Sequence, residues 1–151
     1  MAGQFIDFCI DGYLEGAKEL LRMYPNINIS ASNELAFRQT CYYGQLEVAK
    51  WLLSVKPDIN ISANNANNCE AFRCACHAKR LEVAQWLQSL KPYLYMIEYD
   101  INGNYSGYKI RTKEEANWEK RKYMLHLALQ EKTNILYHLP IDIAKAVTLF
   151  V

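Results

Sequence analysis

Residues 46–53 read LEVAKWLL, and related segments occur on both sides of this octet. Residues 14–21 read LEGAKELL and begin 32 residues earlier, whereas residues 81–87 read LEVAQWL and begin 35 residues later. A period of this size is typical of solenoid proteins, in which each unit buries its apolar face by stacking on its neighbours. The repeat therefore favours an extended binding surface over a catalytic pocket.

The residues around each octet also recur. Every unit has a phenylalanine, a cysteine and a proline at matching offsets: Phe5, Cys9 and Pro25; Phe37, Cys41 and Pro57; Phe72, Cys76 and Pro92. Because the phenylalanine and the cysteine are four residues apart, they fall on one face of a helix. The octet is apolar around most of its circumference, as expected of a second helix sandwiched between neighbours.

Each unit is therefore predicted to contain two helices joined by a turn. Gly12 and Gly44 stand at this turn, where glycine readily adopts a positive φ. The third unit has Lys79 instead, which predicts a strained or differently built turn. Arg38 and Arg73 also share one repeat position, which predicts a structural role, with the guanidinium bridging loop carbonyls of adjacent units.

Two other elements are expected after the third unit. Residues 94–111 contain an apolar alternation, a turn-rich segment and a second extended run, a pattern that predicts a β-hairpin. Thr112 followed by Glu114 and Glu115 predicts the start of a helix, which should continue to about residue 130. A last helix is expected to begin at Pro140.

The bulk composition sets limits on the partners. The chain has 151 residues and a net charge of +1, which gives no general electrostatic reason to expect nucleic acid or an anionic membrane as partner. No apolar run approaches the ~20 residues of a membrane-spanning helix. The first residues lack the basic and apolar regions of a signal peptide. We therefore expect a protein of the cytoplasm or nucleus that is not secreted.

The cysteines and the asparagine tripeptides fit this expectation. The chain has five cysteines, an odd number, and three of them occupy one repeat position, so they are predicted to pack as small buried hydrophobes. The tripeptides that begin at Asn28, Asn60 and Asn104 match the glycosylation sequon. Without a signal peptide, we interpret them as turn-forming segments.

The second unit resembles an ankyrin repeat. The octet at 46–53 followed by Asp58-Ile59-Asn60 is similar to the second helix and turn of that family, and Gly44-Gln45-Leu46 matches its helix–helix turn. Thr40-Cys41 occupies its pair of small residues. The chain departs from the family at residues 35–38, where Leu-Ala-Phe-Arg replaces the usual Thr-Pro-Leu-His. The combination is similar to ankyrin proteins of giant DNA viruses (mimivirus-like) and of their amoebal hosts.

The resemblance implies an all-α fold, an ankyrin-type helical repeat solenoid with a β-hairpin insertion and a helical C-terminal cap. The expected parts are a half repeat at 4–26, repeats at 27–58 and 59–93, a hairpin finger at 94–111, and a helical cap or degenerate repeat at 112–151. All of them belong to a single domain.

The resemblance also implies where a partner binds. In ankyrin repeats the two residues before the turn glycine face a concave groove, and the finger loops contribute further contacts. The candidates for partner binding are Ser32, Glu34, Tyr42, Tyr43, His77, Tyr99 and Tyr105. Tyrosine is enriched at binding hot spots. The alternative for the hairpin tyrosines is that they cover the end of the stack.

The function implied is non-covalent protein binding without catalysis and without a cofactor or metal. A second hypothesis is a substrate adaptor for a ubiquitin ligase, because the segment that begins at Leu139-Pro140 resembles the opening of an F-box.

A third hypothesis is a metal or redox site at Cys69, Cys74 and Cys76, although Cys74 and Cys76 point apart on a helix. A basic run at 120–122 is interleaved with glutamates, as on an ordinary solvated helix. No histidine is placed to activate a nucleophile.

Overall fold

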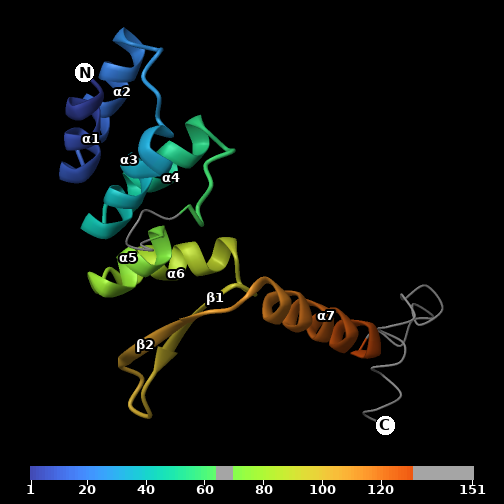
Figure 1. Ribbon diagram of the computed structural model, residues 1–151. Helices are drawn as coiled ribbons and strands as arrows, with labels where there is room; N and C mark the ends of the chain where they lie inside the picture. Colours follow the sequence, from blue (N-terminus) through green and yellow to red (C-terminus); the bar gives the residue numbers. More distant parts are fainter. Residues whose placement is uncertain (64–69, 131–151) are drawn as a thin grey trace.

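The computed structural model describes residues 1–63 and 70–130 and shows helices stacked in pairs, followed by a hairpin and a long helix (Figure 1). The elements are α1 (Ala2–Asp11), α2 (Leu14–Met23), α3 (Ala31–Tyr43), α4 (Leu46–Val55), α5 (Ala71–His77), α6 (Leu81–Leu90), β1 (Tyr95–Tyr99), β2 (Tyr105–Ile110) and α7 (Lys113–Gln130). Helix α3 packs between α1 and α5, so the first helices of the three units form one row. The predicted fold of helical repeats with a hairpin is confirmed.

Each junction between units contains one recurring aromatic contact. The ring centroid of Phe5 lies 6.3 Å from that of Trp51, and Phe37 lies 6.3 Å from Trp86. The phenylalanine of one unit thus meets the tryptophan of the next, which explains why both residues recur in the sequence. The phenylalanines are almost completely buried, and the tryptophans pack against the same core.

The three cysteines at the shared repeat position are part of this core. Cys9, Cys41 and Cys76 are free thiols with at most 1% of their surface exposed. Burial raises the pKa of the Cys9 thiol to about 12 and that of Cys76 to about 11, although hydrogen bonds with Thr40 and Tyr105 oppose the shift. Thiols with such pKa values are protonated at neutral pH and pack as small apolar groups.

The turns between paired helices all use left-handed backbone. φ is 75° at Gly12, 86° at Gly44 and 56° at Lys79. Glycine adopts this conformation at no steric cost, whereas a residue with a Cβ is disfavoured by about 1–2 kcal/mol. The strain predicted for the third turn is therefore present at Lys79.

The loop that precedes α3 contains three further left-handed residues. Ser32, Asn33 and Glu34 have φ between 55° and 60°, so the chain turns sharply before the regular part of α3 begins. The guanidinium of Arg38 stabilises this turn, because its Nε donates to the carbonyl of Asn33 at 2.8 Å and its Nη2 to that of Ser32 at 3.1 Å. The predicted structural role of Arg38 is confirmed, but these carbonyls belong to its own unit.

Two of the asparagine tripeptides form the same local turn. The Asn28 side chain accepts the backbone N–H of Ser30 at 3.1 Å, and the Asn60 side chain accepts that of Ser62 at 3.2 Å. The isoleucine between them is buried in each case. The tripeptide therefore ties each finger loop to the core, as its interpretation as a turn predicts.

The hairpin covers the end of the stack. Its strands are antiparallel and pair from Tyr95 with Ile110 to Tyr99 with Tyr105. The Tyr95 ring lies flat on Phe72, with centroids 4.3 Å apart and planes 6° apart, and Tyr108 meets Phe72 edge-on. Tyr95 therefore takes the position that a tryptophan occupies at the other junctions. For these two tyrosines the structure supports the covering role.

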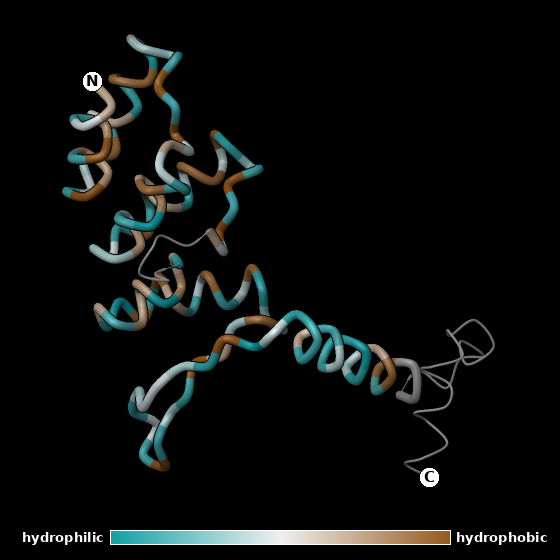
Figure 2. Tube along the Cα trace, viewed as in Figure 1, coloured by the Kyte–Doolittle hydropathy of each residue, from teal (hydrophilic) through white to brown (hydrophobic). Residues whose placement is uncertain are grey.

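Helix α7 begins with the predicted cap. The Thr112 hydroxyl accepts the N–H of Glu115 at 3.1 Å, while the Glu115 carboxylate accepts the N–H of Thr112 at 2.7 Å, which is a capping box. The helix then extends away from the stack and is largely hydrophilic (Figure 2). The helix predicted from Pro140 and the F-box-like segment lie outside the described residues. Among the helices of residues 1–63 and 70–130, none has the length and apolarity needed to cross a bilayer.

Candidate functional site

The C-terminal ends of α1, α3 and α5 form a continuous surface, here called the helix-end surface. Its members are the two residues before each turn: Ile10, Asp11, Tyr42, Tyr43, His77 and Ala78. Because the three helices stack in a row, equivalent residues of successive units lie next to one another. This surface brings together three of the predicted partner-binding residues, Tyr42, Tyr43 and His77.

The two tyrosines at the centre of the helix-end surface are exposed. Tyr42 retains 43% and Tyr43 retains 44% of its accessible surface, and their rings meet edge-on with centroids 5.2 Å apart. Each ring therefore limits the movement of the other while both remain accessible. A large aromatic surface with little side-chain entropy to lose is well suited to protein recognition.

The hairpin borders the helix-end surface beyond α5. The hydroxyl of Tyr108 lies 3.0 Å from Nε2 of His77, and their rings are 5.6 Å apart. The Tyr105 hydroxyl donates to the carbonyl of Cys76 at 3.4 Å. Tyr105 is thus brought to the same surface as His77, but part of its ring covers the end of α5.

The other predicted residues lie elsewhere. The Tyr99 hydroxyl accepts a hydrogen bond from Gln85 of α6 at 3.0 Å, which places Tyr99 on the side of the second helices. Ser32 is exposed in the left-handed turn before the regular part of α3, at the opposite end of that helix from Tyr42. Glu34 is buried, and its carboxylate accepts the backbone N–H of Asn60 at 3.3 Å. Glu34 therefore joins two finger loops.

Sequence reasoning missed the residue that follows each turn. The Gln45 side chain donates to the carbonyl of Ile10 at 3.0 Å, and Arg80 Nε donates to the carbonyl of Tyr42 at 3.4 Å. In both cases this residue reaches back to the helix-end surface of the preceding unit. The signal in the sequence was weak, because glutamine and arginine share only a long side chain with N–H donors.

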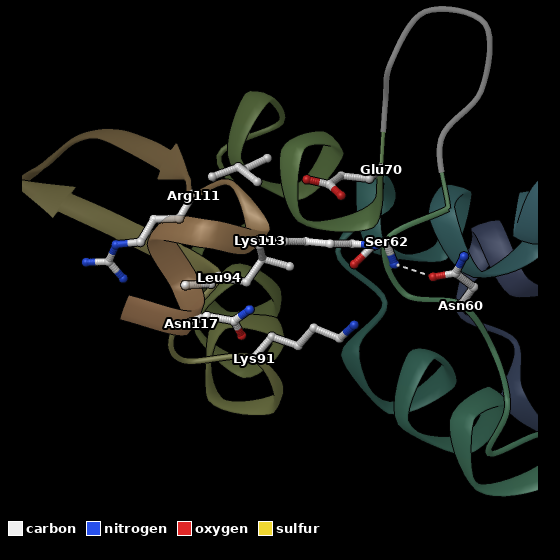
Figure 3. Close-up of a pocket in the computed structure, with 10 residues that line it drawn as sticks. Asn60, Ser62, Glu70, Lys91, Leu94, Arg111, Lys113 and Asn117 are labelled. Carbon is white, nitrogen blue, oxygen red and sulfur yellow. Dashed lines mark hydrogen bonds between the residues drawn. The ribbon is translucent and has the colours of Figure 1, made fainter. Parts of the chain in front are cut away.

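A cavity of about 620 Å³ lies between Asn60, Ser62 and Glu70, which precede α5, the end of α6 and the start of α7 (Figure 3). Its charged lining residues include Glu70, Lys91 and Lys113. Burial raises the pKa of the Glu70 carboxyl, and the charge of Arg73 opposes this shift. Among the described residues its lining offers a single carboxylate and neither histidine nor cysteine, so it lacks the paired groups of nucleophilic catalysis.

The described part of the chain contains no cluster of side chains that would support the metal hypothesis. Cys69 lies outside the described residues, Cys74 is disulfide-bonded and the Cys76 thiol is buried. Within residues 1–63 and 70–130, no three side chains of the metal-binding types come together.

Residues 37–88, from α3 through α6, match the family model described as ankyrin repeats in many copies. This segment is similar to ankyrin repeats. The match spans two pairs of helices and the finger loop between them, in agreement with the stacked arrangement of the structure. No curated protein and no solved structure matches the chain. Ankyrin repeats are generally protein–protein interaction modules, and the family is typically non-enzymatic.

Proposed function

We propose that this chain is a non-catalytic binding module whose protein partner contacts the helix-end surface. The observation that supports this role most strongly is the Tyr42–Tyr43 pair, which lies on the central helix of the stack with both rings more than two-fifths exposed. The neighbouring units present Ile10 and His77 beside it. A partner that covers this row would bury an aromatic centre surrounded by more polar positions, as in protein interfaces.

Binding and stability depend on different residues of the chain. The stack is held by buried contacts such as Phe37–Trp86, to which the exposed tyrosine rings do not belong. Truncation of a central aromatic anchor reduces binding by about 1–2 kcal/mol or more, whereas a surface substitution changes stability by about 0.5 kcal/mol. Tyr42 and Tyr43 should therefore matter for affinity and hardly for folding.

The experiment is an affinity pull-down from amoebal lysate, the source suggested by the sequence resemblance, read by mass spectrometry. The double variant Tyr42→Ala/Tyr43→Ala is compared with wild type and with Tyr24→Ala, which truncates a tyrosine that is 41% exposed away from this surface. We expect one set of proteins to be retained by wild type and Tyr24→Ala and lost from the double variant.

Three results would contradict the proposal. Equal capture by all three forms would place the binding surface elsewhere, and capture of ubiquitin-ligase adaptor components by all three would favour the adaptor hypothesis. If wild type and the double variant enrich nothing over an empty resin, the helix-end surface does not bind a protein of that lysate. Thermal melting of each variant shows that the comparison is made between folded proteins.

A further inference from the structure

The charge of the helix-end surface and of the residues that border it changes sign from one end of the stack to the other. On α1, Asp7 and Asp11 are exposed and four residues apart, so they share one helix face. The end of α3 carries the two uncharged tyrosines. At the end of α5 and the start of α6, Lys79 and Arg80 are exposed. The surface is therefore acidic, aromatic and basic in succession.

These charges are available to a partner. The ion pairs of the described residues form along the second helices, in the segment after α4 and between the hairpin and α7, and none includes Asp7, Asp11, Lys79 or Arg80. Arg80 uses only Nε in its long hydrogen bond to Tyr42, so the other two guanidinium nitrogens remain for a carboxylate. The nearest carboxylate in sequence, Glu82, is exposed on α6.

Stacked helices are about 8–10 Å apart, so the distance from Asp11 to Lys79 across two junctions is roughly 20 Å. An extended chain covers this distance with about six residues. β2 borders the basic end, where Tyr108 contacts His77. The surface thus has the length, the polarity and one defined end that suit a short peptide segment.

We propose that the helix-end surface binds a short acidic segment of its partner in a single orientation. Acidic side chains of the segment face Lys79 and Arg80, an apolar side chain covers Tyr42 and Tyr43, and a neutral or basic residue faces Asp11. The inference rests on the proposed function and specifies the chemistry of the partner. A nucleic-acid backbone fits less well, because its phosphates would continue past the tyrosines onto Asp11 and Asp7.

The second unit supplies a matched variant for the test. Lys79→Gly/Arg80→Gln places the turn residues of that unit, Gly44 and Gln45, at the equivalent positions of the third unit. Both charges are removed, the left-handed position receives glycine, and glutamine is a residue that already donates to the preceding unit at Gln45. The variant is expected to melt at or above the temperature of wild type. Lys50→Gln removes a charge on α4 and serves as control.

The probe is a displayed random-peptide library selected on wild type, and the enriched peptides are then titrated by fluorescence anisotropy. We expect acidic residues on one side of an apolar residue. Lys79→Gly/Arg80→Gln should weaken these peptides about tenfold at low salt, whereas Lys50→Gln should bind as wild type does. The difference should nearly vanish near 1 M salt, where the screening length is about 3 Å.

The outcomes separate this inference from the proposed function. Peptides that need Tyr42 and Tyr43 but show no acidic preference, or that bind Lys79→Gly/Arg80→Gln unchanged, would overturn the charge assignment and leave protein binding intact. If no enriched peptide depends on the two tyrosines, or if none is enriched at all, both proposals fail. Displacement of the peptides by single-stranded DNA as effectively as by unlabelled peptide would replace the acidic segment with nucleic acid.

Discussion

The phenylalanine of each unit is covered by a helix at the interior junctions of the stack and by a strand at its hairpin end. In the interior, Phe5 meets Trp51 and Phe37 meets Trp86 at the same centroid distance of 6.3 Å and at similar tilts. At the end, Phe72 is covered by Tyr95 of a β-strand in a nearly parallel stack at 4.3 Å. In all three places an aromatic ring covers the phenylalanine, and it comes from either a helix or a strand.

Trp51→Ala tests the interior junctions. The substitution removes the partly buried ring that covers Phe5. Truncation of a large core aromatic costs about 3–5 kcal/mol, so we expect a loss toward the lower end of this range. Because the units stabilise one another, urea denaturation should show the whole stack unfolding at lower urea.

Trp118→Ala is the control for this prediction, since Trp118 is 50% exposed on α7. Its effect on the free energy of unfolding should remain within about 0.5 kcal/mol. Equal losses for the two tryptophans would show that the recurring junction contact is not what holds the units together.

Reciprocal exchanges at Gly44 and Lys79 test the turns between paired helices. A methyl group on Gly44 would lie 2.8 Å from Cδ of Arg80, at a backbone with φ of 86°, so Gly44→Ala should destabilise by about 1–2 kcal/mol. Lys79→Gly should stabilise by up to about 1 kcal/mol, because it relieves the same conformation. Thermal denaturation measures both, and a loss of stability in Lys79→Gly would show that its side chain compensates for the strain.

Glu70 should make the stability of the hairpin end depend on pH. The interior junctions have no titratable residue at the equivalent position. Burial raises the pKa of its carboxyl above the usual 4.5, so the folded state binds this proton more tightly than the unfolded state does. The free energy of unfolding should therefore fall as the pH rises from about 4.5 through the raised value. At pH 7, Glu70→Gln should be more stable than wild type by up to about 1 kcal/mol.

The measurement is urea denaturation of both proteins across this range of pH. The difference between them should disappear at acidic pH, where Glu70 is protonated in both states. A wild-type curve parallel to that of Glu70→Gln at every pH would mean that the carboxylate is well solvated or fully compensated by Arg73.

Tyr43→Ala should have only a small effect on folding. The side chain is 44% exposed and its ring contact is with Tyr42, so the free energy of unfolding should change by less than about 1 kcal/mol. The test compares the melting temperatures of Tyr43→Ala and Trp51→Ala. If Tyr43→Ala were as damaging as Trp51→Ala, the helix-end surface would be part of the core.

Much of the fold could be predicted because each unit has to bury the same apolar face against its neighbours. The phenylalanine, the cysteine and the octet recur since each unit presents the same apolar edge, and the hairpin and the Thr112 cap depend on local turn chemistry. The strained turn at Lys79 was predicted by the same comparison of units.

The candidate site was less predictable, since it depends on contacts between distant residues. The sequence could not show that Glu34 is buried against Asn60, because a left-handed run at 32–34 turns the chain inward. Nor could it show that Tyr99 faces α6, which depends on where the hairpin lies. Exposed residues on repeated helices were easier to place, and the position of Tyr42 and Tyr43 was expected from the resemblance to ankyrin repeats.

The contact between Tyr95 and Phe72 also bears on how such an array changes length by gene duplication. A unit added after α6 would have to displace the hairpin from Phe72 and would leave Tyr95 without its stacking partner. A unit duplicated between α4 and α5 would meet phenylalanine and tryptophan edges on both sides, as in the existing interior junctions. The hairpin thus acts as a terminator, and variation in repeat number is expected to occur inside the array.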